Sequence, residues 1–232
     1  MNVIQEIRNS LHNNITRTST AASFGFKTET GEYAEYDQFI GISVPNLRKI
    51  ATIFSEISIS DIQFFLSSKI NEERTFALLV LIKQFQKSVE HIKDELYHFY
   101  MRNLQHINNW NLIDLSAPLI VGHYLYDKNR TILFTLAQSH YWWERRIAIV
   151  ATLYFIRKND LKCTFQIAEL LLNDEHKLLH KGVGWMLREA GKKEKDALIK
   201  FLNIHTIHMP RTMLRYAIEK FDSTEKAFYM RK

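Results

Sequence analysis

The strongest constraint on the fold is a repeat of about 35 residues that recurs along the chain. The segment Glu73–Leu79 resembles Glu144–Val150, which lies 71 positions later, and half of that interval leads close to Trp110. A step of about 35 residues from Arg145 leads to His180, and a slightly shorter step from His180 leads to Arg211. Periods of this length are typical of helical solenoids of the HEAT or TPR kind, in which each repeat is a pair of helices.

Apolar residues follow helical spacing along most of the chain, and strand-like alternation between turn residues is scarce. The one long irregular region expected is 23–44. The spacing predicts helices at 2–14, 45–55, 60–68, 71–87, 89–104, 110–124, 128–139, 142–158, 160–173, 175–191, 193–203, 210–221 and 224–230. The pattern therefore predicts an all-α fold, a helical-repeat (HEAT-like) α-α superhelix with a concave basic cleft. Because no low-complexity linker interrupts the series, we expect a single domain over residues 1–232.

Composition limits the class of protein. Hydrophobic residues make up 46% of the chain and charged residues 24%, which is typical of a soluble globular protein. The single Cys163 excludes an internal disulfide and a cysteine-based zinc cluster, and it fits a reducing compartment. The first residues do not resemble a signal peptide, and no apolar run is long enough to cross a bilayer. We therefore expect a cytoplasmic protein that makes no use of a membrane.

Four residues of unlike chemistry stand at related positions of the repeat. Trp110 and Asp114 are four residues apart, which places a ring and a carboxylate on one helical face. Arg146 follows Trp110 by 36 positions and Trp185 follows Asp114 by 71, so we expect all four on one concave surface. Such a set suits a cationic ligand held beside a phosphate. The alternative is that both tryptophans belong to the core and that Asp114 forms a buried salt bridge with Arg146.

Basic residues recur near the starts of successive predicted helices. Cations at a helix start oppose the helix dipole, and contact with a phosphate would explain their presence there. The net charge of +6 also permits a polyanionic partner. The alternative for each residue is solvated charge, or pairing with Glu144 or Glu189. The candidate DNA-binding residues are Arg145, Lys181, Arg188, Arg211 and Arg215.

The sequence gives no sign of cofactor chemistry. It contains no phosphate-binding loop, no dinucleotide fingerprint and no G-x-S-x-G elbow. His176 and His180 have the i,i+4 spacing of metal ligands, but a third ligand is not evident. We therefore expect no metal and no nucleotide cofactor.

At the residues singled out above, the sequence resembles the AlkD-type DNA alkylation repair glycosylases, a family built of HEAT-like repeats. The resemblance covers nearly the whole chain. Its most specific parts are Trp110–Pro118, Trp143–Ile149, Lys181–Glu189 and Met209–Arg215, and Phe39–Arg48 matches the N-terminal portion of the family.

The resemblance implies an enzyme that hydrolyses the N-glycosidic bond of cationic alkylated purines, N7-alkylguanine and N3-alkyladenine, in duplex DNA and leaves an abasic site. It implies that Asp114 is the catalytic carboxylate, that Trp110 and Trp185 are the cleft tryptophans, and that Arg146 is the key arginine. The implied partner is double-stranded DNA containing alkylated bases. A monomer is the simplest expectation for the oligomeric state.

Two questions stay open in the sequence. Residues 27–38 look longer and more polar than in the best-known members of the family, and a further aromatic contact would fall on Tyr33 or Tyr36. The function has one close alternative, a non-catalytic binder of distorted or branched DNA with the same fold. A helical scaffold for protein partners is a third possibility, which the row of basic residues disfavours.

Overall fold

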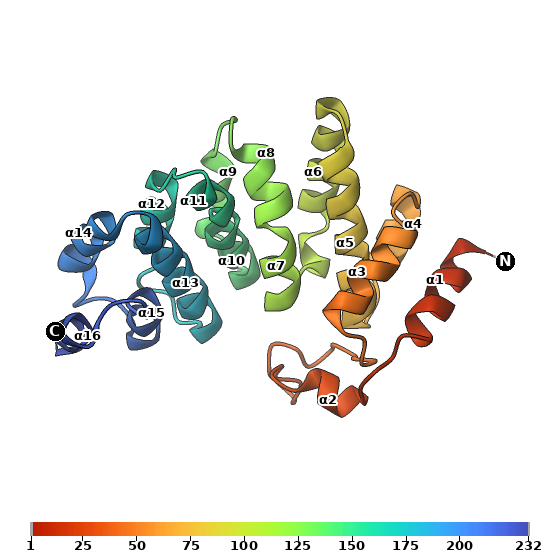
Figure 1. The fold of residues 1–232 in the computed structure, drawn as a ribbon, viewed down its shortest axis with the longest axis horizontal. Coiled ribbons are helices and arrows are strands. Elements are labelled where there is room, and N and C mark those ends of the chain that lie inside the picture. Colours follow the sequence, from red (N-terminus) through yellow and green to blue (C-terminus); the bar gives the residue numbers. More distant parts are fainter. Residues whose placement is uncertain (1, 232) are drawn as a thin grey trace. The chain divides into compact units, whose positions relative to one another are not determined.

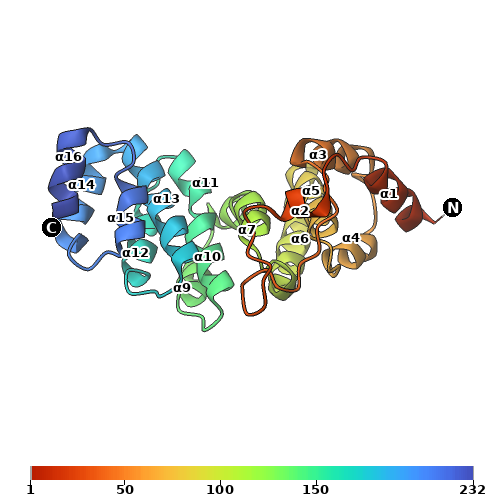
Figure 2. The same ribbon diagram turned by 90° about the horizontal axis from the view of Figure 1, so that it is seen from below.

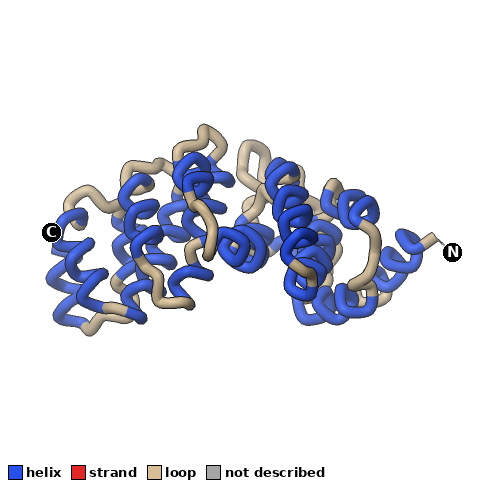
Figure 3. Tube along the Cα trace, turned by 90° about the horizontal axis from the view of Figure 1, so that it is seen from above, coloured by secondary structure: helices blue, strands red, loops and turns tan. Residues whose placement is uncertain are grey.

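The computed structural model of the chain describes residues 2–231, which fold mainly into helices joined by loops (Figure 1 and Figure 3). Strand-like pairing within these residues is limited to two isolated β-bridges. The all-α class predicted from the apolar spacing is confirmed. The chain divides into two compact units, Met1–Ser116 (the N-terminal unit) and Ala117–Lys232 (the C-terminal unit). One domain over residues 1–232 stays a prediction.

The N-terminal unit is organised around one long central helix, α5. Its helices are α1 (Val3–His12), α2 (Ser19–Ser23), α3 (Val44–Ile53), α4 (Ile59–Leu66), α5 (Asn71–Lys87), α6 (Glu90–Arg102), the 3-10 turn η1 (Leu104–His106) and α7 (Trp110–Ser116). Helices α3, α4, α6 and α7 all pack against α5, which is buried along Asn71–Ile82. A helix covered on every side needs apolar residues all around, and this explains why α5 lacks a single apolar stripe.

Local sequence signals set the starts of α3 and α4. Pro45 occupies the first turn of α3, as its fixed φ favours. At α4, the hydroxyl of Ser58 accepts the N–H of Asp61 at 3.2 Å, and the Asp61 carboxylate accepts the N–H of Ser58 at 3.3 Å. Ser58 caps the helix because Asp61 then stands at the third helical position, from which a carboxylate can bond back to the cap.

The C-terminal unit is built of successive helices around α13. Its helices are the π-helical turn η2 (Pro118–Gly122), α8 (His123–Leu125), α9 (Thr131–Ala137), α10 (Trp142–Ala151), α11 (Leu153–Arg157), α12 (Lys162–Leu170), α13 (Lys177–Lys193), α14 (Lys195–His205), α15 (Arg211–Ala217) and α16 (Ser223–Arg231). Helix α13 contacts α10, α12, α14 and α15. A Cβ on Gly184 would overlap the carbonyl oxygen of Met213 and the Cβ of Tyr216, so glycine permits the close approach of α13 and α15.

The predicted helix 110–124 is interrupted at Pro118. Proline has no N–H to donate to the carbonyl of Asp114, so the regular hydrogen-bond ladder cannot continue there. The chain forms a π-helical turn instead, and the N–H of Gly122 bonds to the carbonyl of Ala117 at 2.9 Å. The chain over 110–124 is therefore not one regular helix but α7, the π-helical turn and the short α8.

The segment between α1 and α3 is largely irregular, as predicted, but it contains the unpredicted α2. Figure 1 and Figure 2 show this segment crossing one end of α5. Bridges from Gln38 to Ile70 and from Ile15 to Ile42 fix its course. Helix α2 has five residues, none of them buried, so apolar periodicity could not reveal it. No helix within residues 2–231 is long and apolar enough to span a membrane.

Candidate functional site

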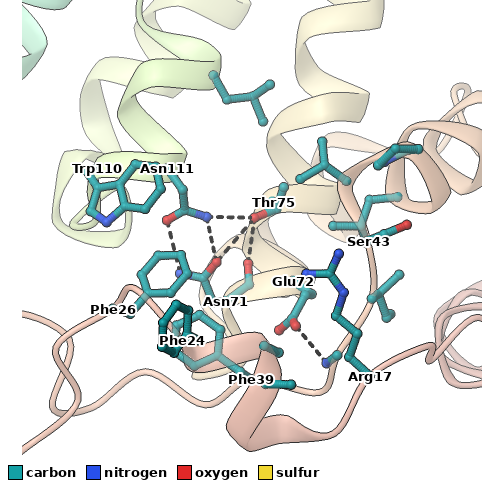
Figure 4. A pocket seen from close by; sticks show the side chains of 18 of the residues that line it. Arg17, Phe24, Phe26, Phe39, Ser43, Asn71, Glu72, Thr75, Trp110 and Asn111 are labelled. Carbon is teal, nitrogen blue, oxygen red and sulfur yellow. Dashed lines mark hydrogen bonds between the residues drawn. The ribbon is translucent and has the colours of Figure 1, made fainter.

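A cavity of about 570 Å³ opens in the N-terminal unit between α2, α5 and α7 (Figure 4). Trp110 and Asp114 both line it, from successive turns of α7. Both side chains are half-buried, so each keeps a surface that a ligand can touch. The structure thus brings together the ring and the carboxylate that the i,i+4 spacing placed on one face.

Phenylalanines of the irregular segment form the other aromatic wall of this cavity. Phe26 stacks on Trp110 with ring centroids 5.1 Å apart and planes 16° apart. Phe39 lies against Phe26 at 4.6 Å, and both residues line the cavity. Stacked aromatic rings offer a flat apolar surface whose faces also attract cations.

The aromatic contact was expected at Tyr33 or Tyr36, and neither residue lines this cavity. The hydroxyl of Tyr33 donates to the carbonyl of Gly25 at 3.3 Å, and Tyr36 is 81% exposed. Phe26 occupies the position beside Trp110 instead. Gly25, which directly precedes Phe26, has a φ of 93°, a conformation that favours glycine.

A buried polar network positions the start of α7. The carboxylate of Asp37 pairs with Arg74 and accepts hydrogen bonds from Asn71 at 3.0 Å and Asn109 at 2.7 Å. Asn109 directly precedes Trp110, so the network holds the backbone from which the ring projects. The amide of Asn111 also bonds to Asn71 at 2.7 Å. These five residues, the Asp37 network, tie the irregular segment to α5 and α7.

Two carboxylates line the cavity, and their surroundings differ. The Glu72 oxygens accept the backbone N–H groups of Ile40 at 3.1 Å and Gly41 at 2.8 Å. These bonds commit Glu72 to holding the loop, because unsatisfied buried N–H groups are costly. Asp114 is the other carboxylate among the described residues that line the cavity. The arrangement therefore gives Glu72 a structural role in holding the loop.

Arg146 and Trp185 lie in the C-terminal unit. The guanidinium of Arg146 is buried and donates to the carbonyl of Leu178, close to Gly182 of α13. Trp185 is half-buried and lines a hollow of about 430 Å³ whose rim includes Arg157 and Lys192. The convergence of these two residues with Trp110 and Asp114 stays a prediction.

The candidate DNA-binding cations have different environments. Arg145 forms a salt bridge with Asp174 at 2.6 Å, a partner that the sequence did not suggest. Arg188 pairs with Glu189 at 3.1 Å and with Glu219. Although burial alone would raise it, the pKa of Glu189 lies below its ordinary value because Lys192 and Arg188 donate hydrogen bonds to it. Glu189 is therefore ionised and offsets part of the local positive charge.

The other three candidate cations are exposed. Arg211 donates to the carbonyl of Met230, and Lys181 and Arg215 project from α13 and α15. Their exposure makes them accessible to an external anion. Contact of all five cations with DNA stays a prediction.

The paired histidines have structural partners. The ring of His176 stacks on Trp142 with centroids 4.8 Å apart, and Nε2 of His180 bonds to the carbonyl of Asp174. Within residues 2–231, no group of three or more His, Cys, Asp or Glu side chains could hold a metal ion.

Burial, which outweighs the effect of nearby Arg130, raises the pKa of Cys163 to about 11.

A sequence profile of the DNA alkylation repair enzyme family matches residues 8–221. The chain belongs to this family. Among solved structures, the chain is similar to one described as "Predicted DNA alkylation repair enzyme from Enterococcus faecalis", with a TM-score of 0.68 and 14% identity over 89% of this chain and 95% of that one. At that identity the likeness shows the fold alone. No curated protein matches the chain.

Membership of the DNA alkylation repair enzyme family confirms the resemblance noted in the sequence and places the protein in DNA repair. The cavity also contains residues that the sequence did not single out, namely Arg17, Phe26, Phe39 and Glu72. Glu72 and Phe26 contact residues more than 30 positions away, Gly41 and Trp110, so no local signal marks them.

Proposed function

We propose that this DNA alkylation repair enzyme is a monofunctional DNA-alkylpurine N-glycosylase. It would hydrolyse the N-glycosidic bond of N7-alkylguanine or N3-alkyladenine in duplex DNA and leave an abasic site. The observation that carries the proposal is the cavity of the N-terminal unit, where the Asp114 carboxylate shares a wall with Trp110 and the stacked Phe26.

The charge of the substrate explains why this set of groups suffices. An alkylated purine is already positively charged, so its bond to C1′ can break without a proton donor. The base departs with the bonding electrons, which neutralise it, and positive charge develops on the sugar. A carboxylate at Asp114 stabilises that charge and orients the water whose oxygen bonds to C1′. The water's proton passes to the carboxylate or to solvent.

The aromatic wall supports recognition of the same substrate. The face of Trp110 attracts the cationic base or sugar, an interaction of about 0.5–2 kcal/mol. Trp185 and Arg146 would add a second ring and a phosphate anchor, as the family resemblance implies. Because the leaving group carries its own charge, we propose that the reaction needs no metal or nucleotide cofactor. We also propose that the protein acts as a monomer.

DNA supplies the partner that the overall charge favours. The chain carries a net charge of +6, and Lys181, Arg211 and Arg215 are exposed. Neutralising phosphates releases counterions and gives affinity for any DNA sequence. Lesion selectivity would then come from the cavity around Trp110 and Asp114.

The test is release of 7-methylguanine or 3-methyladenine from alkylated duplex DNA by the purified protein. We expect release by wild type and a loss of about 100- to 1000-fold in Asp114→Asn, with DNA affinity largely retained. Asp127→Asn, an exposed position of the C-terminal unit, makes the same chemical change and should behave as wild type.

Two results would contradict the proposal in different ways. Wild-type release by Asp114→Asn would remove this carboxylate from the mechanism. Absence of release from every alkylated duplex, together with tight binding of branched DNA, would favour a non-catalytic DNA binder.

A further inference from the structure

Arg17 lines the same cavity as Trp110 and Asp114. It lies just before α2, and its side chain is exposed. Among the described residues that line this cavity, Arg17 is the one cationic side chain. Figure 4 shows it on the side of the cavity away from Trp110, beside Glu72. The cavity is therefore lined by one cationic side chain and by two carboxylates, Glu72 and Asp114.

The backbone of Arg17 is held in place by buried contacts. The N–H groups of Thr16 and Arg17 both donate to the carbonyl of Gly41, at 3.0 and 3.1 Å. Gly41 has a φ of 94°, and a Cβ there would overlap the Arg17 carbonyl group. The N–H of Gly41 in turn bonds to the buried Glu72 at 2.8 Å. These contacts fix the base of the Arg17 side chain at the mouth of the cavity.

The guanidinium of Arg17 is not bound to a carboxylate, as several others within residues 2–231 are. Arg145 and Arg188 are bound to carboxylates. No salt bridge of residues 2–231 involves Arg17, since Glu72 uses its oxygens for backbone N–H groups. An exposed guanidinium with a fixed base can give two parallel hydrogen bonds to a phosphate with less loss of entropy than a mobile one.

A ligand that contacts both Arg17 and Asp114 should carry both signs of charge. A nucleotide with an alkylated base does so, because positive charge passes from its base to its sugar during bond cleavage and its phosphates are negative. We propose that Arg17 binds a phosphodiester of the DNA strand whose damaged nucleotide lies against Trp110. The assignment rests on the proposed function and adds to it a phosphate contact within the N-terminal unit.

The experiment measures DNA affinity as a function of salt, by fluorescence anisotropy with duplex DNA carrying a tetrahydrofuran abasic-site analogue. The full-length variants are Arg17→Ala, Arg17→Lys and the control Arg102→Ala, an exposed arginine at the end of α6 and outside the cavity. Circular dichroism verifies that each variant is folded.

We expect Arg17→Ala to weaken binding about tenfold, as loss of a charged hydrogen bond does. The slope of log affinity against log salt should fall by about 0.9, the value for one phosphate of B-DNA. Arg17→Lys should keep most of the slope because it keeps the charge. Arg102→Ala should match wild type.

Wild-type affinity and slope in Arg17→Ala would overturn the assignment. So would weaker binding with an unchanged slope, since that would show a contact other than phosphate, or an equal change in Arg102→Ala. Base release is a separate measurement. If no alkylated duplex releases base while Arg17→Ala lowers the salt slope, the glycosylase proposal fails and the phosphate contact stands.

Discussion

The Asp37 network gives a direct test of how the candidate site is held in place. Asp37 and Arg74 form an ion pair whose side chains are only 8% and 5% exposed. Replacing Asp37 by Asn keeps the shape of the side chain and removes its charge. The Arg74 guanidinium then remains buried without a counter-charge, which costs more than the loss of one hydrogen bond.

The structure sets the size of the effect. Removing one partner of a buried ion pair costs about 3–5 kcal/mol of folding free energy. Arg74 also donates to the carbonyl of His106 at 3.3 Å and to Asn108, and these bonds keep the loss within that range. We expect Asp37→Asn to lower the free energy of unfolding by about 3–5 kcal/mol, measured by urea denaturation followed by circular dichroism.

An exposed pair supplies the control. Glu56 lies 3.7 Å from Lys87, and both side chains are mostly exposed. Glu56→Gln should cost less than about 1 kcal/mol because water screens the pair. A double variant of Asp37→Asn with Arg74→Leu should lose less stability than the two single variants added together. A loss below about 1 kcal/mol in Asp37→Asn would refute the reasoning, because it would mean that Arg74 is solvated.

Two further predictions concern the C-terminal unit. Burial raises the pKa of Cys163 to about 11, so only about one thiol in a thousand is ionised at pH 8. A thiol reagent should therefore label Cys163 far more slowly in native protein than in urea, and equal rates would contradict this. Arg146→Ala should lower the free energy of unfolding by about 1.5–3 kcal/mol through loss of the charged bond to Leu178. An unchanged urea midpoint would show that the Arg146 side chain is free in solution.

The regular part of the fold could be predicted because its signal is local. Helix α5 runs from Asn71 to Lys87, as predicted. A helix of this length can be recognised from the spacing of its apolar residues. The segment between α1 and α3 could not be predicted in the same way. Its course depends on Glu72 and on the Asp37 network, whose partners lie 31 to 72 positions apart in the sequence. Such contacts leave no periodic trace.

The residues of the candidate site show the same difference between local and distant contacts. Trp110 and Asp114 share a cavity because helical geometry alone brings residues i and i+4 together. Phe26 joins them only through the folded loop, and nothing in its neighbours distinguishes it from Phe24, which is 90% exposed. Trp110 and Asp114, on one regular helix, were therefore predictable, whereas Phe26, on the loop, was not.

The recurrence of basic residues has a structural explanation that the sequence could not separate from DNA contact. Several basic side chains, with Arg145 and Arg188 of the predicted row among them, bond to a group further along the chain. The pairs are Arg74 with His106, Arg130 with Asp160, Arg145 with Asp174, Arg146 with Leu178, Arg188 with Glu219 and Lys195 with Glu225, each 29 to 32 positions apart. Each of these bonds ties one segment to a later one, so the cation that makes it has a structural role.

This explanation changes which cations are the strongest candidates for phosphate. A guanidinium already bonded to a carboxylate or carbonyl must give up that bond, or share it, to bind an external anion. Lys181 and Arg215 are exposed and carry no such bond to the next repeat within residues 2–231. Arg17 precedes the series of paired cations and lies in the cavity with Asp114. Arg17, in the cavity with Asp114, is therefore a stronger candidate for contact with DNA than Arg145 and Arg188, which are already paired.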